Sequence, residues 1–162
     1  MRDVLYKAKR IDNGEWIEGG IVERDGRAYI VGISKNLRID GIEVDPNTIC
    51  QFTGLYDSTK FEELSEVEQR EFLDEGNMSF DWKGKKIWEN DVLHLKTRPK
   101  VRQQTEFLTT VDWDAYCAGF MIEDDEEGGA VGLDAITENG IYEIIENLGS
   151  IFDNAELLEG QV

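Results

Sequence analysis

The side chains most able to carry out chemistry are three aspartates in the last third of the sequence. Asp112 and Asp114 lie in a stretch where polar and apolar residues alternate, and Asp124 or Asp125 follows after a predicted hairpin. Alternation places Asp112 and Asp114 on one face of a strand, and a few carboxylates with water can hold Mg²⁺. A metal-dependent hydrolase that uses Asp112 and Asp114 is therefore one hypothesis. The run from Asp124 to Gly128 lacks the alternation of a calcium loop, however, and acidic hairpin ends are usually only solvated.

Other catalytic signals are weak. The sequence contains no GxSxG, HExxH, GxxxxGK[ST] or GxGxxG motif. His94 could act as a general base, but a histidine on a strand is more often an ordinary half-buried imidazole. Cys50 and Cys117 are the only cysteines and form no CxxC, so the usual zinc ligand sets cannot be assembled, and we expect both to be small buried side chains. The sequence thus predicts a protein that is not an enzyme, with no catalytic residue, metal or cofactor.

Acidic side chains dominate the composition. The 162 residues hold 17 Lys and Arg against 35 Asp and Glu, a net charge of −18 at pH 7, and no Lys or Arg follows Val111. Because non-specific affinity for nucleic acid comes mainly from cationic side chains, direct nucleic-acid binding is disfavoured. One basic strip remains, whose ordinary use is to pair with acidic segments or to solvate a loop. The strip consists of Lys83, Lys85, Lys86, Lys96, Arg98, Lys100 and Arg102.

Turn signals divide most of the chain into short strands. Asp12-Asn13-Gly14 and Asp25-Gly26 are typical of hairpin turns, and the pair Gly19-Gly20 suggests a bulge or a bend. Residues 43–49 are expected to form an edge segment interrupted at Pro46. The last element, residues 154–158, resembles one helical turn. The edge segment leads to the stretch 51–55. Strands are expected over residues 4–9, 16–22, 28–31, 86–96, 109–114, 119–122 and 141–149, with an acidic turn over 123–129.

Residues 58–82 differ from this pattern. Ser65-Glu66-Val67-Glu68 fits a capping box, in which the serine and the glutamate three positions later satisfy free amides at a helix start. Gly76-Asn77 supplies residues that tolerate the left-handed backbone at a helix end. The sequence predicts one short, acidic helix here, as a solvated insertion, with partner binding as the alternative.

Three stretches resemble the YopX-like proteins of bacteriophages and prophages. Sequences of that family carry a central pattern close to QYTGLKD, then NGKEIYEGDIV, and finish near IGNIYENPELL. Residues 51–57 read QFTGLYD, residues 83–92 read KGKKIWENDV, and residues 148–158 read LGSIFDNAELL. Asn90 stands where the family usually has glycine, and asparagine is the next best residue for a tight turn. The matching positions, for which we expect a scaffold role, include Gln51, Phe52, Thr53, Gly54, Leu55, Asp57, Gly84, Lys85, Ile87, Trp88, Glu89, Asp91, Gly149, Asn154, Leu157 and Leu158.

The resemblance and the short strands together predict a mainly β fold. It is expected to be a β-rich α+β, antiparallel, small-barrel-like or YopX-like fold that forms a single domain over 1–162, with the helical insertion at about 58–82. No stretch approaches the roughly 20 apolar residues that span a bilayer. The resemblance implies a cytoplasmic protein of the bacterial host.

The family carries no established activity to transfer, so two non-enzymatic hypotheses remain. The first is a phage-encoded accessory protein that acts through protein–protein contacts or as a homo-oligomer, because aromatic residues and strand edges are abundant. The second is a nucleic-acid mimic, whose acidic last third would occupy the basic DNA channel of a host enzyme.

Overall fold

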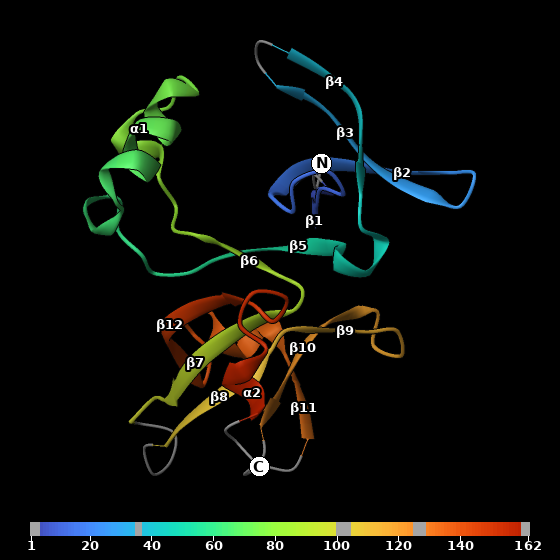
Figure 1. Cartoon of the computed structure of the whole chain (residues 1–162). Coiled ribbons are helices and arrows are strands. Elements are labelled where there is room, and N and C mark those ends of the chain that lie inside the picture. Colours follow the sequence, from blue (N-terminus) through green and yellow to red (C-terminus); the bar gives the residue numbers. More distant parts are fainter. Residues whose placement is uncertain (1–3, 35–36, 100–104, 125–128, 160–162) are drawn as a thin grey trace. The chain divides into compact units, whose positions relative to one another are not determined.

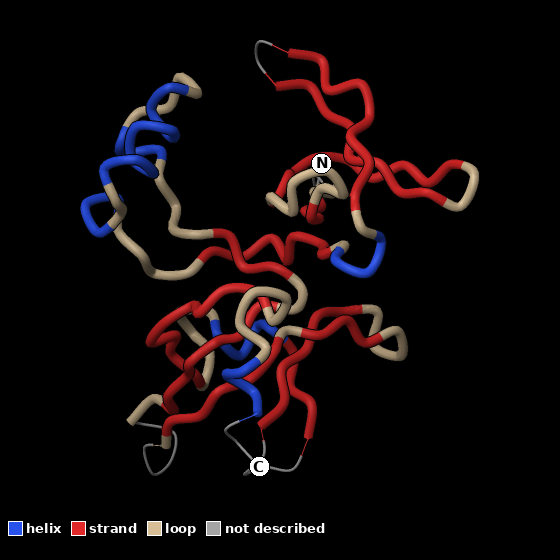
Figure 2. The backbone as a smooth tube through the Cα atoms, viewed as in Figure 1, coloured by secondary structure: helices blue, strands red, loops and turns tan. Residues whose placement is uncertain are grey.

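The computed structural model describes residues 4–34, 37–99, 105–124 and 129–159. The chain forms two compact units, one of Met1–Phe52 with Lys60–Trp82 and the other of Thr53–Thr59 with Lys83–Val162. Strands are the main secondary structure of both units, as the red segments of Figure 2 show. The two units have separate hydrophobic cores.

An antiparallel meander forms the sheet of the first unit, as the sequence predicts. Its strands are β1 (Tyr6–Lys9), β2 (Trp16–Arg24), β3 (Arg27–Ser34), β4 (Leu37–Val44) and the start of β5 (Cys50–Tyr56), in the order β4-β3-β2-β1-β5 (Figure 1). Asp25 and Gly26 both have positive φ angles, 53° and 76°, which the predicted tight turn requires. The core of this sheet contains Ala8, Ala28, Ile30 and Val44.

The glycine pair of β2 marks the point where this strand changes partner. Gly19 pairs with Tyr6 of β1, and Gly20 pairs with Val31 of β3. A Cβ atom on Gly19 would lie 2.5 Å from the backbone oxygen of Val31. Glycine is therefore needed here for close approach of two backbones.

The edge segment expected over residues 43–49 is only partly a strand. β4 ends at Val44, and a 3₁₀ turn, η1 (Pro46–Thr48), follows. Proline has no backbone N–H to donate to a sheet, and the side chain of Asp45 accepts a hydrogen bond from the backbone N–H of Asn47 at 3.0 Å. These local bonds favour the turn over a continued strand.

The insertion, Lys60–Trp82, contains the predicted helix, drawn in green in Figure 1. Helix α1 (Glu66–Asp74) begins with the expected capping box between Ser65 and Glu68, and Gly76 has a φ angle of 85° after its end. Two 3₁₀ turns, η2 (Phe61–Glu63) and η3 (Ser79–Asp81), flank the helix.

Two antiparallel three-stranded sheets form the body of the second unit. One has the order β12-β7-β8, from β7 (Asp91–Thr97), β8 (Glu106–Thr110) and β12 (Tyr142–Ser150). The other has the order β11-β10-β9, from β9 (Asp112–Asp114), β10 (Gly119–Asp124) and β11 (Gly129–Gly132). The end of β5 adjoins β6 (Lys86–Trp88), and η4 (Leu133–Ile136) and α2 (Glu156–Glu159) complete the unit. Its core contains Ile87, Leu93, Leu95, Val111, Phe120, Ile122, Leu133, Ala135, Ile136 and Tyr142.

The mainly β, antiparallel fold with one short helical insertion is confirmed. Barrel closure is not: within the described ranges the sheets keep edge strands such as β8 and β11. Only the end of β4 meets the segment after β1, through the bridge between Arg10 and Val44. The strand predicted over 86–96 is interrupted by a turn at Glu89-Asn90, and the helical turn near the end is present as α2. Most of the predicted acidic turn, residues 125–128, lies outside the described residues. No helix in the described part of the chain has both the length and the apolar character needed to cross a membrane.

Candidate functional site

The three aspartates of the metal hypothesis do not form a common site. Asp114 closes a turn, because its Oδ1 accepts hydrogen bonds from the backbone N–H groups of Tyr116 at 2.7 Å and Cys117 at 3.0 Å. Asp124 is buried and accepts a hydrogen bond from the hydroxyl of Tyr142. Asp112 lies opposite Met121 on the neighbouring strand. Among the described residues, no group of three or more His, Cys, Asp or Glu side chains could hold a metal ion.

Partial burial raises the pKa of Asp112, and the nearby carboxylate of Glu123 raises it further. Both effects disfavour the charged form of Asp112. With Asp114 and Asp124 engaged in structural hydrogen bonds, the geometry gives the metal-dependent hydrolase no support.

His94 and the cysteines also have ordinary environments. His94 is half-buried, and its Nε2 lies 3.4 Å from Oε2 of Glu106 on the adjacent strand. Cys50 is buried, as predicted, and its thiol donates a hydrogen bond to the backbone oxygen of Thr48 at 3.3 Å. The prediction that Cys117 is buried is wrong, because this residue lies in the exposed turn between β9 and β10, where no second layer covers it.

The first two family motifs meet in the second unit through backbone hydrogen bonds. Oδ1 of Asp57 accepts hydrogen bonds from the N–H groups of Thr59 at 3.0 Å and Lys85 at 2.8 Å, and the N–H of Asp57 donates to the oxygen of Lys85 at 2.8 Å. The hydroxyl of Thr53 donates to the oxygen of Ile87 at 2.7 Å. Gly84 has a φ of 112°, and a Cβ there would lie 2.0 Å from the backbone oxygen of Asp57.

The turn after β6 depends on an aspartate and an asparagine. Asp91 is buried, and its Oδ2 accepts a hydrogen bond from the N–H of Trp88 at 2.9 Å and another from Nδ2 of Asn147 at 3.3 Å. Asn90 has a φ of 65°, in the left-handed region that asparagine tolerates better than most residues. Asn90 therefore adopts the backbone conformation for which glycine is usual at this position.

The third motif forms the turn after β12. Gly149 has a φ of 85° and donates its N–H to Oδ1 of Asn147 at 3.0 Å. Nδ2 of Asn154 donates to the backbone oxygens of Leu148 at 3.0 Å and Ser150 at 3.2 Å. These bonds tie the segment before α2 to the end of the strand.

The remaining motif residues lie along the same elements. Gln51 pairs with Tyr6, and the N–H of Phe52 donates to the oxygen of Leu5 at 2.8 Å. Gly54 has a φ of 86°, and Leu55 packs against the core of the second unit. Ile87 and Trp88 are buried, Lys85 is exposed, and Glu89 and Leu157 are half-buried. The position of the Leu158 side chain lies outside the described part of the chain.

The basic strip is dispersed among separate local contacts. The ammonium groups of Lys83 and Lys86 lie 5.8 and 5.7 Å from the ring centroids of Tyr56 and Trp88. Nζ of Lys96 lies 3.4 Å from Glu143, and Nη2 of Arg98 donates to the oxygen of Thr137 at 3.3 Å. Lys100 and Arg102 lie outside the described residues. Of these contacts, that of Lys96 is the expected pairing with an acidic side chain, whereas Lys83 and Lys86 lie over aromatic rings and Arg98 bonds to the backbone.

A small polar pocket of about 160 Å³ lies in the second unit. Asp57, Ser58, Thr59 and Lys85 line one side of it, and residues 144–147 of β12 line the other. Oδ1 of Asp57 already accepts two backbone hydrogen bonds, and the side chain of Asn147 bonds to Asp91 and Gly149. Asp57 and Asn147, which line the pocket, are therefore already used in hydrogen bonds within the protein.

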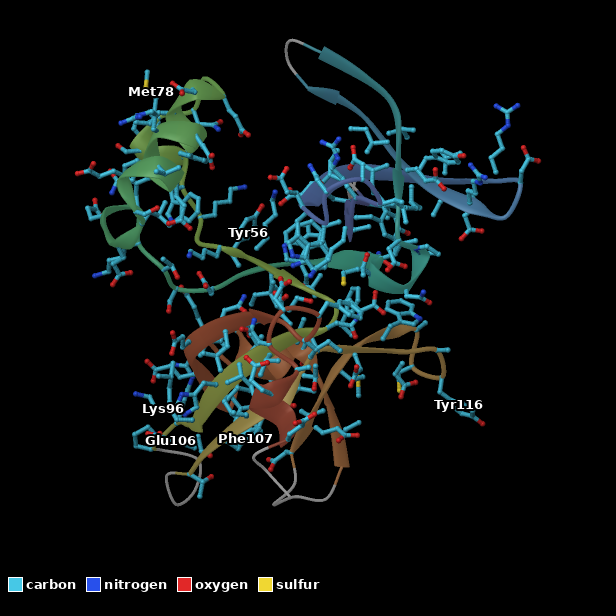
Figure 3. The ribbon with its side chains drawn as sticks, viewed as in Figure 1. Tyr56, Met78, Lys96, Glu106, Phe107 and Tyr116 are labelled. Carbon is cyan, nitrogen blue, oxygen red and sulfur yellow. The ribbon has the colours of Figure 1, made fainter. Side chains whose placement is uncertain are left out.

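The insertion presents large apolar side chains to solvent, a feature that the sequence analysis missed. The exposed fraction is 84% for Phe80, 59% for Met78, 61% for Val67 and 43% for Leu73. Figure 3 shows Met78 pointing away from the ribbon of the insertion. These four residues are called the insertion's apolar set below. The signal in the sequence was available: Met78 and Phe80 are apolar residues placed beyond the helix end, between Gly76-Asn77 and the acidic Asp81.

A second exposed aromatic site lies at the hairpin between β9 and β10. Tyr116 is fully exposed and points away from the hairpin turn in Figure 3. Trp113 is 46% exposed, and its ring packs on that of Phe120 with centroids 5.0 Å apart.

The chain matches the model of a known protein family. The family described as YopX protein matches residues 61–159, well over half of the chain. Comparisons with curated proteins and with solved structures found no match.

Proposed function

Because the chain belongs to the YopX protein family, which indicates a phage-type accessory protein, we propose that it acts through protein–protein contacts. The partner is a protein of the bacterial host or of the phage, or further copies of the chain itself, and the place of action is the host cytoplasm. The observation that carries the proposal is the exposure of large apolar side chains in both units, above all Phe80 and Tyr116.

The physical argument rests on the cost of exposing these groups. An apolar side chain left in water forgoes about 25 cal/mol for each Å² that it could bury. Aromatic residues and methionine are enriched at the centres of protein interfaces, where a few such anchors supply most of the binding energy. Phe80 and Met78 contact water in the isolated chain, so covering them with a partner would be favourable.

Light scattering and affinity capture test the proposal together. We would measure the mass of the free protein over a wide concentration range, and capture proteins from host cytosol with the wild type, Phe80→Ser and Tyr116→Ser. The expected result is a defined oligomer or a captured protein that one of the substitutions removes. A monomer at every concentration, with no captured protein that either substitution affects, would contradict the proposal.

A nucleic-acid mimic is the second candidate, and one observation favours it. Several carboxylates of the segment without Lys or Arg are exposed, among them Glu123 on β10 and Glu143 and Glu146 on β12. Capture of a basic DNA-handling protein that salt abolishes, and that Phe80→Ser and Tyr116→Ser leave intact, would favour this alternative over apolar contact.

A further inference from the structure

We propose that the insertion, Lys60–Trp82, is the partner-binding element, and that its partner is a protein with an apolar groove bordered by Lys and Arg side chains. This inference rests on the proposed function and adds to it the binding segment and the chemistry of the partner. Three observations carry it: the insertion is held together by its own contacts, it exposes its apolar set, and it carries a net negative charge.

The insertion has its own small core of aromatic rings. The ring centroids of Phe72 and Trp82 lie 5.1 Å apart, those of Phe61 and Phe72 6.0 Å, and those of Phe61 and Trp82 6.5 Å. Leu64 is buried as well. Phe61, Phe72 and Trp82 pack on one another and form this core, whereas the side chains of the apolar set remain exposed to solvent.

Side-chain hydrogen bonds fix each turn of the insertion. Carboxylate oxygens of Glu63, Glu68 and Asp81 accept the N–H groups of Lys60 at 2.6 Å, Ser65 at 2.9 Å and Met78 at 2.8 Å. The side-chain amides of Gln69 and Asn77 each donate to a backbone oxygen, of Leu64 and Phe72 respectively, at 3.0 Å. A segment fixed in this way loses little conformational freedom when it binds, which favours affinity.

Charge specifies the partner. The insertion holds eight acidic and two basic side chains, a net charge of −6 over 23 residues. Besides the carboxylates used for capping, Glu62, Glu66, Glu71 and Asp74 are exposed. An apolar anchor on an acidic segment is complementary to an apolar groove bordered by basic side chains, and such pairs associate faster at low salt.

The same charge argues against a second copy of this chain as the occupant. The chain as a whole carries −18, and two acidic insertions would repel each other at close range. It also argues against nucleic acid, whose phosphates are negative. A protein with a basic surface and an apolar groove is the partner that fits both the apolar set and the negative charge of the insertion.

Site-specific photo-cross-linking in bacterial host cells tests the inference with the full chain. A photoreactive phenylalanine analogue replaces Phe80 in one variant and Tyr116 in a second. Phe80 is mostly exposed and lies outside the three-ring core, so the substitution should leave the fold intact, which circular dichroism and the mass of the free protein check. The expected result is a cross-link from position 80 to a partner peptide that is apolar and flanked by Lys or Arg.

The identified partner is then titrated with purified protein. Phe80→Ser should weaken binding about tenfold or more, as truncation of an interface anchor does, and Glu71→Gln with Asp74→Asn should slow association at low salt and have little effect at high salt. Ile11→Ser, which changes an exposed apolar side chain outside the insertion, is the matched control and should leave the affinity unchanged.

The outcomes separate this inference from the proposed function. Cross-links from position 116 alone, or from position 80 to a second copy, would overturn the inference and leave the proposed function standing. A partner surface at position 80 that is acidic or lacks apolar residues would overturn it too. Cross-links from neither position would overturn both.

Discussion

At the scale of single residues, the family motifs of this chain consist largely of positions that hold the backbone in place. Oδ1 of Asp57 and Oδ2 of Asp91 accept backbone N–H groups, and the side chain of Asn154 donates to backbone oxygens. Buried carboxylates that accept such bonds stabilise turns, because an unsatisfied buried amide costs about 1–3 kcal/mol. Stabilisation of a turn thus explains residues in each motif without any ligand.

Gly84 offers the sharpest prediction at this scale. Gly84→Ala should lower the free energy of unfolding by about 2–4 kcal/mol, because the added Cβ would lie 2.0 Å from the backbone oxygen of Asp57 at a φ of 112°. The matched control is Gly14→Ala, where φ is 72° but no atom lies within 4 Å of the added Cβ. The control should cost only about 1 kcal/mol. Urea denaturation followed by circular dichroism measures both, and equal losses would show that the contact with Asp57 is unimportant.

At the scale of elements, local signals predicted the boundaries well. The capping box at Ser65, the turn at Asp25-Gly26 and the strand over 141–149 all appear in the structure close to their predicted positions. The strand predicted over 86–96 is divided by a turn, since Asn90 adopts a left-handed backbone and the Asp91 side chain bonds back to Trp88. The error at residues 43–49 has a similar cause, because the bond from Asp45 to the following turn outweighs strand propensity.

The insertion helix provides a prediction at this scale. Ser65→Ala removes the acceptor for the N–H of Glu68 and the hydroxyl that donates to Oε2 of Glu68 at 2.8 Å. Loss of such a cap costs about 0.5–2 kcal/mol, and we expect faster hydrogen exchange in residues 66–74 with no change in the strands of the second unit. Ser65→Asp, which keeps an acceptor, serves as the control and should retain slow exchange. Mass spectrometry of exchanged peptides reads out both variants, and an unchanged rate in Ser65→Ala would mean that the cap does not support the helix.

At the scale of the whole molecule, the expectation of one domain over 1–162 stays a prediction. The structure shows two compact units with separate cores, but the chain passes between them three times, after Phe52, Thr59 and Trp82. Strand β5 also runs without a break from one unit into the other. Unfolding one unit therefore removes part of a strand that the other unit uses.

Scanning calorimetry tests this prediction. We expect one transition in which the calorimetric and van't Hoff enthalpies agree, because the shared strand couples the two units. Two resolved transitions would contradict the one-domain interpretation and would assign each core its own cooperative unit.

The sequence by itself determined the features that depend on neighbours in the chain. Capping, tight turns and strand alternation arise from contacts within a few residues, so the patterns around Ser65 and Asp25 were sufficient to predict the helix start and the tight turn there. The acidic composition, likewise, needed no structure. Only the tertiary structure decided which side chains are covered: Asp124 is buried against Tyr142, Cys117 is exposed, and Phe72 packs with Phe61 and Trp82 while Phe80 is left in solvent. Burial depends on which segments, distant in the sequence, pack against each other, and residue type alone does not specify that packing.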